Sequence, residues 1–301
     1  MKNIGGQAVI EGVMMRSPNA WTVAVRGPNK DIFVKKEEIT PLPKLLKKPV
    51  IRGVVALVQS LMLGIKAITY SAEKAMPEEE GKPSSFSMGI TVFLAFALGI
   101  VIFILLPLYA TKLLGIIFST VMENSIAFNL VDGVIRIFFF LLYVVLISIN
   151  KDIKRVFQYH GAEHKTIYAH EAGVELTVEN IENYSILHPR CGTSFLLIVM
   201  ILSILIFSFI PQDWPFIEKF LSRVVLIPLI AGLSYEFIKF SSKKIDNPLV
   251  RMMTKPGLWL QQFTAKTPAN DQVEVAIVAL KEVLQMEAGI AERKKGEGNA
   301  D

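Results

Sequence analysis

The residues best suited to chemistry gather in one polar stretch of the chain. All four histidines lie there, at His160, His164, His170 and His188, and Cys191, the only cysteine, follows three residues later. Residues four apart are neighbours on one face of a helix, so the imidazoles of His160 and His164 can converge on one ion. The spacing predicts a divalent metal site, with zinc as the expected metal.

A carboxylate stands beside these two histidines, in the sequence His160-Gly-Ala-Glu163-His164. This order is the inverse of the zinc-peptidase motif, in which a carboxylate next to two histidine ligands acts as a base toward water. We therefore expect Glu163 to be the general base if the site is hydrolytic. The chain has no room for the large soluble catalytic domain of those peptidases, so the similarity concerns the chemistry rather than the fold.

The second part of the polar stretch reads His188-Pro-Arg190-Cys191-Gly-Thr and offers two more ligands. Four protein ligands would close the shell of a structural zinc site, whereas three would leave a position for water and catalysis. The sequence leaves both possibilities open. It also leaves open a site without metal, in which the histidines form hydrogen bonds and Cys191 is a small packing residue.

The N-terminal segment Gly5–Arg16 is glycine-rich but lacks the Lys-Ser/Thr ending of a phosphate-binding loop, so no nucleotide is expected. Its two charged residues, Glu11 and Arg16, can line a site. A tight turn followed by a strand accounts for the glycines equally well.

The elements that must position these residues include membrane helices. Hydrophobic residues make up 52% of the chain, and four stretches are long and apolar enough to cross a bilayer: 88–110, 128–149, 194–211 and 221–240. The expected fold class is mostly α, a polytopic helical membrane protein with about four transmembrane helices. Its membrane domain would be residues 88–240, interrupted by a His/Cys loop at 151–192.

The distribution of basic residues predicts the orientation of these spans. Thirteen Lys or Arg precede the first span, five lie in the 151–192 loop and ten lie in residues 239–301, whereas the two proposed outer loops hold only Lys112 and Lys219. The positive-inside rule then places both termini and the His/Cys loop in the cytoplasm. Topology explains the basic residues, so no nucleic-acid partner is expected.

Two segments before the first span have their own patterns. Residues 1–44 are expected to form a small β-hairpin element, with strands at 21–26 and 31–35 flanking a Gly-Pro-Asn-Lys turn. Residues 45–87 would hold a linker and an apolar segment, 53–65, that is too short to span comfortably. We expect it to be an amphipathic or re-entrant helix at the interface, the alternative being a fifth span.

Two helices are expected on the cytoplasmic side. Residues 151–172 can continue the second span as one helix, which Gly173 would end. Residues 241–301 form the C-terminal tail, with a helix at about 271–290 capped by Asn270 or Asp271. This helix should dock its apolar face on protein or membrane, and it is the expected contact for a protein partner.

Charged residues within the spans must face protein or water, because burial of a charge in lipid is costly. Arg136 in the second span can pair with Asp132 one turn away. Glu236, near the cytoplasmic end of the fourth span, can be a distant metal ligand, a hydrogen-bond partner of a ligand histidine, or an interfacial carboxylate. These charges give little indication of a channel or transporter.

Five motifs in order resemble the YqhQ-like family of bacterial integral membrane proteins. They are Gly-Gly-Gln-Ala-Val-Ile-Glu-Gly-Val-Met-Met-Arg, Tyr-His-Gly-Ala-Glu-His-Lys, His-Pro-Arg-Cys-Gly-Thr-Ser-Phe, Ser-Tyr-Glu and Lys-Pro-Gly-Leu-Trp-Leu-Gln. The resemblance covers nearly the whole chain and implies a domain of unknown function that is sometimes described as a metal-dependent enzyme. His160, Glu163, His164, His188, Cys191 and Glu236 fall within these motifs, so His170 ranks last as a ligand.

The leading hypothesis is a metal-dependent enzyme with a cytoplasm-facing His/Glu/Cys site at the membrane interface. Hydrolysis of an amphipathic or membrane-bound substrate is the expected reaction. The alternative is a non-enzymatic membrane assembly, transport or scaffold factor that holds a structural metal ion or none.

Overall fold

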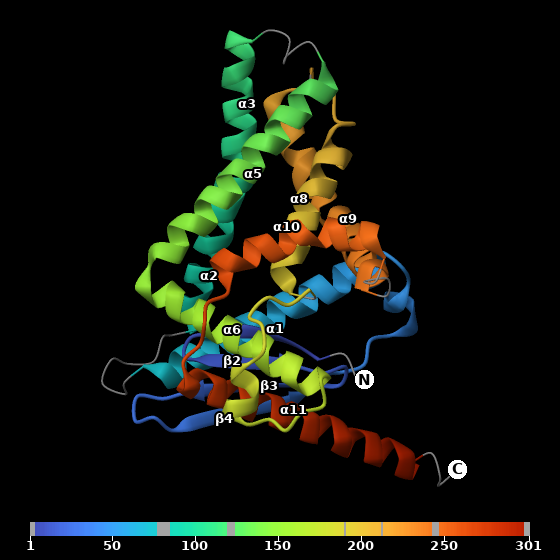
Figure 1. Cartoon of the computed structure of the whole chain (residues 1–301). Coiled ribbons are helices and arrows are strands. Elements are labelled where there is room, and N and C mark those ends of the chain that lie inside the picture. Colours follow the sequence, from blue (N-terminus) through green and yellow to red (C-terminus); the bar gives the residue numbers. More distant parts are fainter. Residues whose placement is uncertain are drawn as a thin grey trace.

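The computed structural model of the chain describes residues 4–76, 85–118, 124–189, 191–211, 213–242 and 247–297. The described part is mostly helical, with one small antiparallel sheet near the N-terminus. Figure 1 shows two parts: a layer that contains the sheet, and a group of long helices that rises from this layer.

The sheet has four strands in chain order: β1 (Gly5–Val9), β2 (Gly12–Arg16), β3 (Ala20–Arg26) and β4 (Ile32–Glu38). The strands predicted at 21–26 and 31–35 are therefore present. The N-terminal element is larger than the expected single hairpin, because the glycine-rich segment forms a hairpin of its own, with Glu11 at a positive φ of 50° in its turn.

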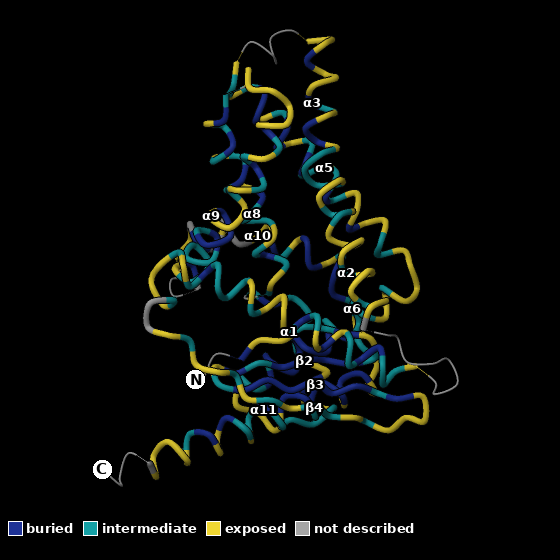
Figure 2. The backbone as a smooth tube through the Cα atoms, turned by 180° about the vertical axis from the view of Figure 1, so that it is seen from behind, coloured by how far each residue is buried: buried dark blue, intermediate teal, exposed yellow. Residues whose placement is uncertain are grey.

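Both faces of the central strands are buried. Trp21, Val23 and Val25 of β3 belong to one apolar cluster, and Ala20 and Ala24 belong to another on the opposite face. This follows from the period of two along a strand, which sends successive side chains to opposite faces. The sheet is therefore a packed layer between helices, as the dark blue strands in Figure 2 illustrate.

One face of the sheet is covered by α6 (Lys151–Glu171) and α11 (Asn270–Glu297). The C-terminal helix begins at the predicted cap and runs seven residues beyond the predicted end at 290. Its apolar stripe is buried against the sheet and α6: Val273, Ala276, Ile277, Leu280 and Val283. The face expected to dock on protein thus docks on this chain's own N-terminal sheet.

The other face of the sheet is covered by α1 (Ile51–Ala75), which follows a short 3-10 helix, η1 (Lys44–Lys47). The helix is 25 residues long, so the short segment predicted at 53–65 underestimates it. Its buried face continues past Lys66 through Ala67, Ser71 and Ala72. The expected linker before residue 88 lies partly at 77–84, outside the described residues.

Within the described segments, three helices are long and apolar enough to cross a membrane: Ile51–Ala75, Phe86–Ile117 and Ser125–Ile149. The second is continuous and comprises α2 (Ser85–Ile100), a π-helical turn η3 (Val101–Leu105) and α3 (Leu106–Ile117); the third is α5. The spans predicted at 88–110 and 128–149 lie inside these helices. Large exposed apolar surface on them indicates association with a membrane.

The other two predicted spans correspond to helices of different character. α8 (Gly192–Phe207) is apolar but has only 16 residues, and it ends before the predicted boundary at 211. α9 (Phe216–Ser242) contains Pro228 and several charges, and it is not among the three helices that meet the criteria for a span. One of its charges, Arg223, was not among the predicted charged residues of the spans.

Arg223 belongs to a buried polar cluster between α5 and α9. The predicted pair is present, with Arg136 Nη2 2.7 Å from Asp132 Oδ2. Arg223 Nη1 lies 2.7 Å from the other carboxylate oxygen, and its Nη2 donates to Asn129 Oδ1 at 3.0 Å. The Asp132 carboxylate therefore bridges the two guanidinium groups, so each of these buried charges has a partner of opposite sign.

The second span and the histidine helix are separate helices, which corrects the prediction of one continuous helix. Asn150 adopts an extended conformation, ends α5 and caps α6 by accepting hydrogen bonds from Asp152 N and Ile153 N. Such a side chain satisfies the free N–H groups of a new helix. At the other end, Gly173 with φ 72° terminates α6 as predicted.

Two helices were not anticipated: α7 (Val178–Glu182) and α10 (Pro248–Thr264). α10 packs across α8 and ends beside α6. It therefore brings residues from the C-terminal third of the chain to the histidines.

Candidate metal centre

Three of the predicted ligands meet at one point. The ligand atoms of His160 and His164 on α6 and of Cys191, the N-cap of α8, all lie within 4.8 Å of one another. His160 Nε2 is 3.2 Å from Cys191 Sγ, and the centroids of the two imidazole rings are 4.3 Å apart. The helical spacing thus places both rings as expected, and His170 is not part of the group.

Both imidazoles are oriented by backbone carbonyls. His160 Nδ1 donates to the Thr264 carbonyl at 2.7 Å, and His164 Nδ1 donates to the Ile186 carbonyl. A carbonyl only accepts, so Nδ1 is the donor in each ring and Nε2 is the nitrogen that remains to bind a metal. Metal-binding histidines are commonly held in this way, so the donor set fits a borderline divalent cation such as zinc.

A close contact with the segment after α10 positions His160. A Cβ atom at Gly161 would lie only 2.0 Å from the Lys266 carbonyl oxygen, so a side chain has no space there. Lys266 N also donates to the Phe157 carbonyl at 2.9 Å. The absence of a side chain at Gly161 lets the Thr264 carbonyl approach the imidazole.

His188 lies beside the three-ligand group without joining it. Its backbone N–H and C=O bond to the Gln261 side chain at 2.8 and 2.9 Å, and its ring packs against Tyr168. Burial, followed by the nearby His164, lowers the pKa of His188 to about 4, so its imidazole is neutral at pH 7. The role of Gln261 was missed, although it ends the Lys-Pro-Gly-Leu-Trp-Leu-Gln motif.

Glu163 is buried between α6 and the first strand. Its carboxyl group fills the space beside Gly6, where a Cβ would lie 2.8 Å from three Glu163 atoms. Burial raises the pKa of this carboxyl to about 7, while His160 and a hydrogen bond from the Gly6 N–H act in the opposite direction. Glu163 is thus next to the ligand group and is not itself one of the three converging residues.

The remaining predicted residues have separate positions. Glu236 accepts hydrogen bonds from Arg52 Nε at 2.6 Å and from a backbone N–H at the start of α1, and so acts as an interhelical carboxylate. Glu11 pairs with Arg155 of α6, which fixes the first hairpin on that helix. Arg190 lies outside the described residues.

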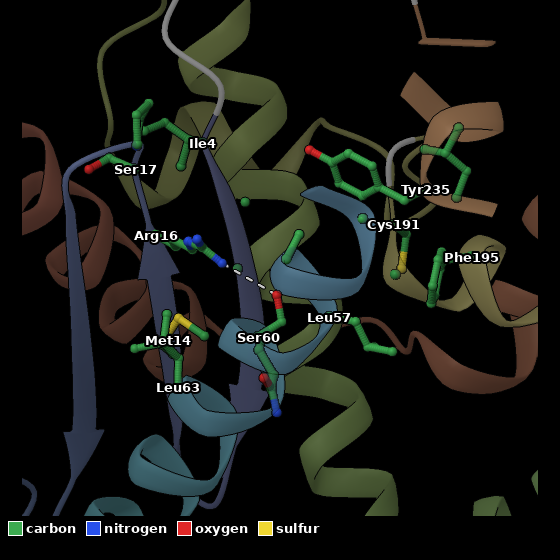
Figure 3. Close-up of a pocket in the computed structure, with 18 residues that line it drawn as sticks. Ile4, Met14, Arg16, Ser17, Leu57, Ser60, Leu63, Cys191, Phe195 and Tyr235 are labelled. Atoms are coloured by element: carbon green, nitrogen blue, oxygen red, sulfur yellow. Dashed lines mark hydrogen bonds between the residues drawn. The ribbon is translucent and has the colours of Figure 1, made fainter. Parts of the chain in front are cut away.

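Arg16 lines a cavity of about 600 Å³ between the sheet, α1 and the beginning of α8. In Figure 3, Arg16 extends from β2 toward Ser60 of α1, with Cys191 and Phe195 at another part of the wall. Cys191 therefore belongs both to the candidate metal group and to the cavity wall. The contribution of α1 was missed because its segment carries no distinctive polar motif.

The fold and the site define a helical, membrane-associated protein with a small N-terminal sheet and a His/His/Cys group. The model of the DUF1385 family, described as a protein of unknown function, matches residues 48–286. The uncharacterised protein YqhQ of Bacillus subtilis (strain 168) is 35% identical over 311 residues, which cover 98% of this chain and 96% of that protein. The chain belongs to this family, which confirms the resemblance. No solved structure matches it significantly.

Proposed function

We propose that this protein is a metal-dependent hydrolase of the membrane interface. The observation that carries the proposal is the convergence of His160, His164 and Cys191, with both Nδ1 atoms held by carbonyls and Cys191 shared with a cavity wall. Three protein ligands leave a position open, which is typical of catalytic rather than structural zinc.

The residues around the group suit hydrolysis. Zinc, when bound, supplies a Lewis acid that activates water. Glu163 would take up the released proton on its carboxylate, because it is adjacent to both ligand histidines and is enclosed away from competing solvent contacts. The neutral His188 ring lies beside His164, Tyr168 packs on His188, and together these rings would limit the access of bulk water.

The membrane arrangement forms part of the proposal. The chain would be multi-pass, with α2–α3, α5, α8 and α9 in the bilayer and both termini in the cytoplasm. α1 would lie at the membrane interface, because it packs against both the sheet and α9. The substrate would be amphipathic or membrane-bound, since α6, which carries both histidines, packs on the sheet, whereas Cys191 begins the apolar helix α8.

Elemental analysis of purified protein tests the metal assignment. We expect about one zinc ion per chain in the wild type and nearly none in the His160→Ala/His164→Ala double variant. His188→Ala is the matched control, because it removes a buried neighbouring imidazole outside the three-ligand group, and it should retain zinc. Equal metal content in all three proteins would contradict the site.

The role of Glu163 is tested separately. Glu163→Gln keeps the shape of the side chain but cannot take up the proton, so it should retain zinc and fold yet lose hydrolysis of ester and amide amphiphiles. We expect a loss of about a hundredfold or more, as for other positioned bases. Undiminished hydrolysis by zinc-loaded Glu163→Gln would exclude this role.

The second candidate function is a non-enzymatic assembly, transport or scaffold factor with a structural metal ion. It is favoured by the second contact of Cys191, whose Sγ accepts the Thr193 N–H at 3.4 Å and caps α8. An ion there would clamp α6 to the start of α8. Under this alternative, zinc removal would lower the Tm strongly and Glu163→Gln would have no effect in cells.

A further inference from the structure

The cavity beside Cys191 has a mostly apolar wall. Its apolar side chains come from the N-terminal sheet and the residue before it, from α1, from the start of α8 and from α9. They include Ile4, Met14, Leu57, Leu63, Phe195 and Ile238. Its volume of about 600 Å³ lies within the usual range of small-molecule sites. Such a wall favours an apolar chain over a nucleotide or a free phosphate ion.

A guanidinium group enters this apolar space without a counter-ion. Arg16 Nη1 donates to Ser60 Oγ at 3.3 Å and Nη2 donates to Gln59 Oε1 at 3.1 Å, and both acceptors are neutral. Among the described residues, no carboxylate forms an ion pair with Arg16. By contrast, Arg52 and Arg155 each have a glutamate partner.

An unneutralised cation in a partly buried, apolar setting is stabilised by a bound anion. A guanidinium bonds carboxylate and phosphate oxygens strongly because its N–H groups match their geometry and the hydrogen bonds are charge-assisted. Ser60 in the same wall accepts from Arg16, so its own hydroxyl proton can be donated to such a headgroup. The cavity thus combines one anion-binding point with a long apolar lining.

We propose that this cavity binds a single-chain amphiphile with an anionic headgroup, which Arg16 holds while the acyl chain lies along the apolar wall. This names the substrate class of the proposed hydrolase and, in that respect, rests on the proposed function. Cys191 in the wall would place the bound molecule next to the candidate metal group. The binding itself depends on Arg16 and on the shape of the cavity.

The test measures binding to the full chain in phosphatidylcholine nanodiscs, with empty nanodiscs subtracted. The probes are palmitate and lysophosphatidate, which carry carboxylate and phosphate headgroups, and hexadecanol, which has the same chain as palmitate without the charge. At least one anionic probe should bind about tenfold or more tightly than hexadecanol, and the tighter one identifies the headgroup. Equal binding of all three would overturn the inference.

Variants locate the binding site. Arg16→Gln should weaken the anionic probe about tenfold or more and leave hexadecanol unchanged, whereas Arg16→Lys should recover part of the affinity. Leu57→Trp fills the cavity and should weaken every probe. Arg293→Gln is the matched control, because this guanidinium is exposed, is paired with Glu38 and lies outside the cavity lining. Equal weakening by Arg293→Gln, or no effect of Arg16→Gln and Leu57→Trp, would place the binding elsewhere.

Zinc content measured on the same samples separates this inference from the proposed function. Arg16-dependent binding by a protein that holds no zinc would support the amphiphile site and contradict the metal-dependent hydrolase. Zinc-loaded protein that binds no anionic amphiphile would overturn the inference and leave the metal centre intact.

Discussion

At Glu163, a carboxyl group is enclosed by the backbone of a strand and by its own helix. Gly6 has no side chain, so the carboxyl group lies directly against β1 and accepts a hydrogen bond from the Gly6 N–H. This arrangement restricts the carboxylate to one position beside His160. The position of the proposed base therefore depends on a glycine that is distant in sequence.

The importance of this contact can be tested with two adjacent glycines. In Gly6→Ala the new methyl group would lie 2.8 Å from Glu163, so we expect a loss of about 1–3 kcal/mol in unfolding free energy and displacement of the carboxylate. Thermal unfolding in detergent measures the loss. Gly5→Ala is the control, because nothing lies within 4 Å of its Cβ position. Similar stability of the two variants would argue against this contact.

At the scale of elements, α6 is positioned from several sides. Asn150 separates it from α5, Glu11 holds it to the first hairpin through Arg155, and the segment after α10 supplies the carbonyl that orients His160. The grouping of His160, His164 and Cys191 therefore depends on how α6, α8 and α10 meet as well as on the spacing of the histidines.

Gly161→Ala tests this junction. The added methyl would push the Lys266 carbonyl away, and the Thr264 carbonyl would move with it. His160 should then lose its orientation, and the zinc affinity of the protein should fall about tenfold. Competition with a zinc chelator measures the affinity. Gly289→Ala on α11 meets no atom within 4 Å and should keep the wild-type affinity. An unchanged affinity in Gly161→Ala would mean that the carbonyl contact does not matter for the metal.

A second prediction at the scale of elements concerns the stability contributed by the buried polar cluster between α5 and α9. Asp132→Ala leaves Arg136 and Arg223 buried without their carboxylate, so it should cost about 3–5 kcal/mol of stability. Asp152→Ala removes an exposed carboxylate and should cost far less. Thermal unfolding of both variants in the same detergent decides this, and a similar Tm for the two would show that the cluster is not stabilising.

For the whole molecule, the decisive feature is a core shared by the two ends of the chain. β2 and β3 pack with α11 in one apolar cluster that also includes α6 (Figures 1 and 2). The N-terminal sheet and the C-terminal helix must therefore lie on the same side of the membrane. This requires an even number of crossings between them, whatever the identity of the crossing helices.

Epitope tags at the two termini test this topology. In spheroplasts of a bacterial host, both tags should resist added protease and become sensitive together when the membrane is permeabilised. This outcome is expected because the positive-inside rule places the basic segments in the cytoplasm. Sensitivity of one tag alone in intact spheroplasts would mean that the number of crossings between the two termini is odd, and this would contradict the shared core.

The sequence by itself determined the membrane association, one of the two hairpins of the N-terminal sheet, the C-terminal helix and the proximity of His160 to His164. These features depend on local periodicity, composition and helical spacing, which each segment carries alone. They also sufficed to identify Arg136 and Asp132 as partners, because residues one helical turn apart are neighbours.

Only the tertiary structure decided that Cys191 rather than His188 lies with His160 and His164, and that Arg16 rather than Glu11 lines the cavity beside Cys191. It also showed that Arg223 contacts Asp132, that the Thr264 carbonyl orients His160, and that Gln261 bonds to the backbone of His188. Contacts between residues distant in sequence depend on how helices cross, and a side chain's charge or spacing does not specify that geometry. The site is therefore set by packing between elements that the sequence pattern describes only one at a time.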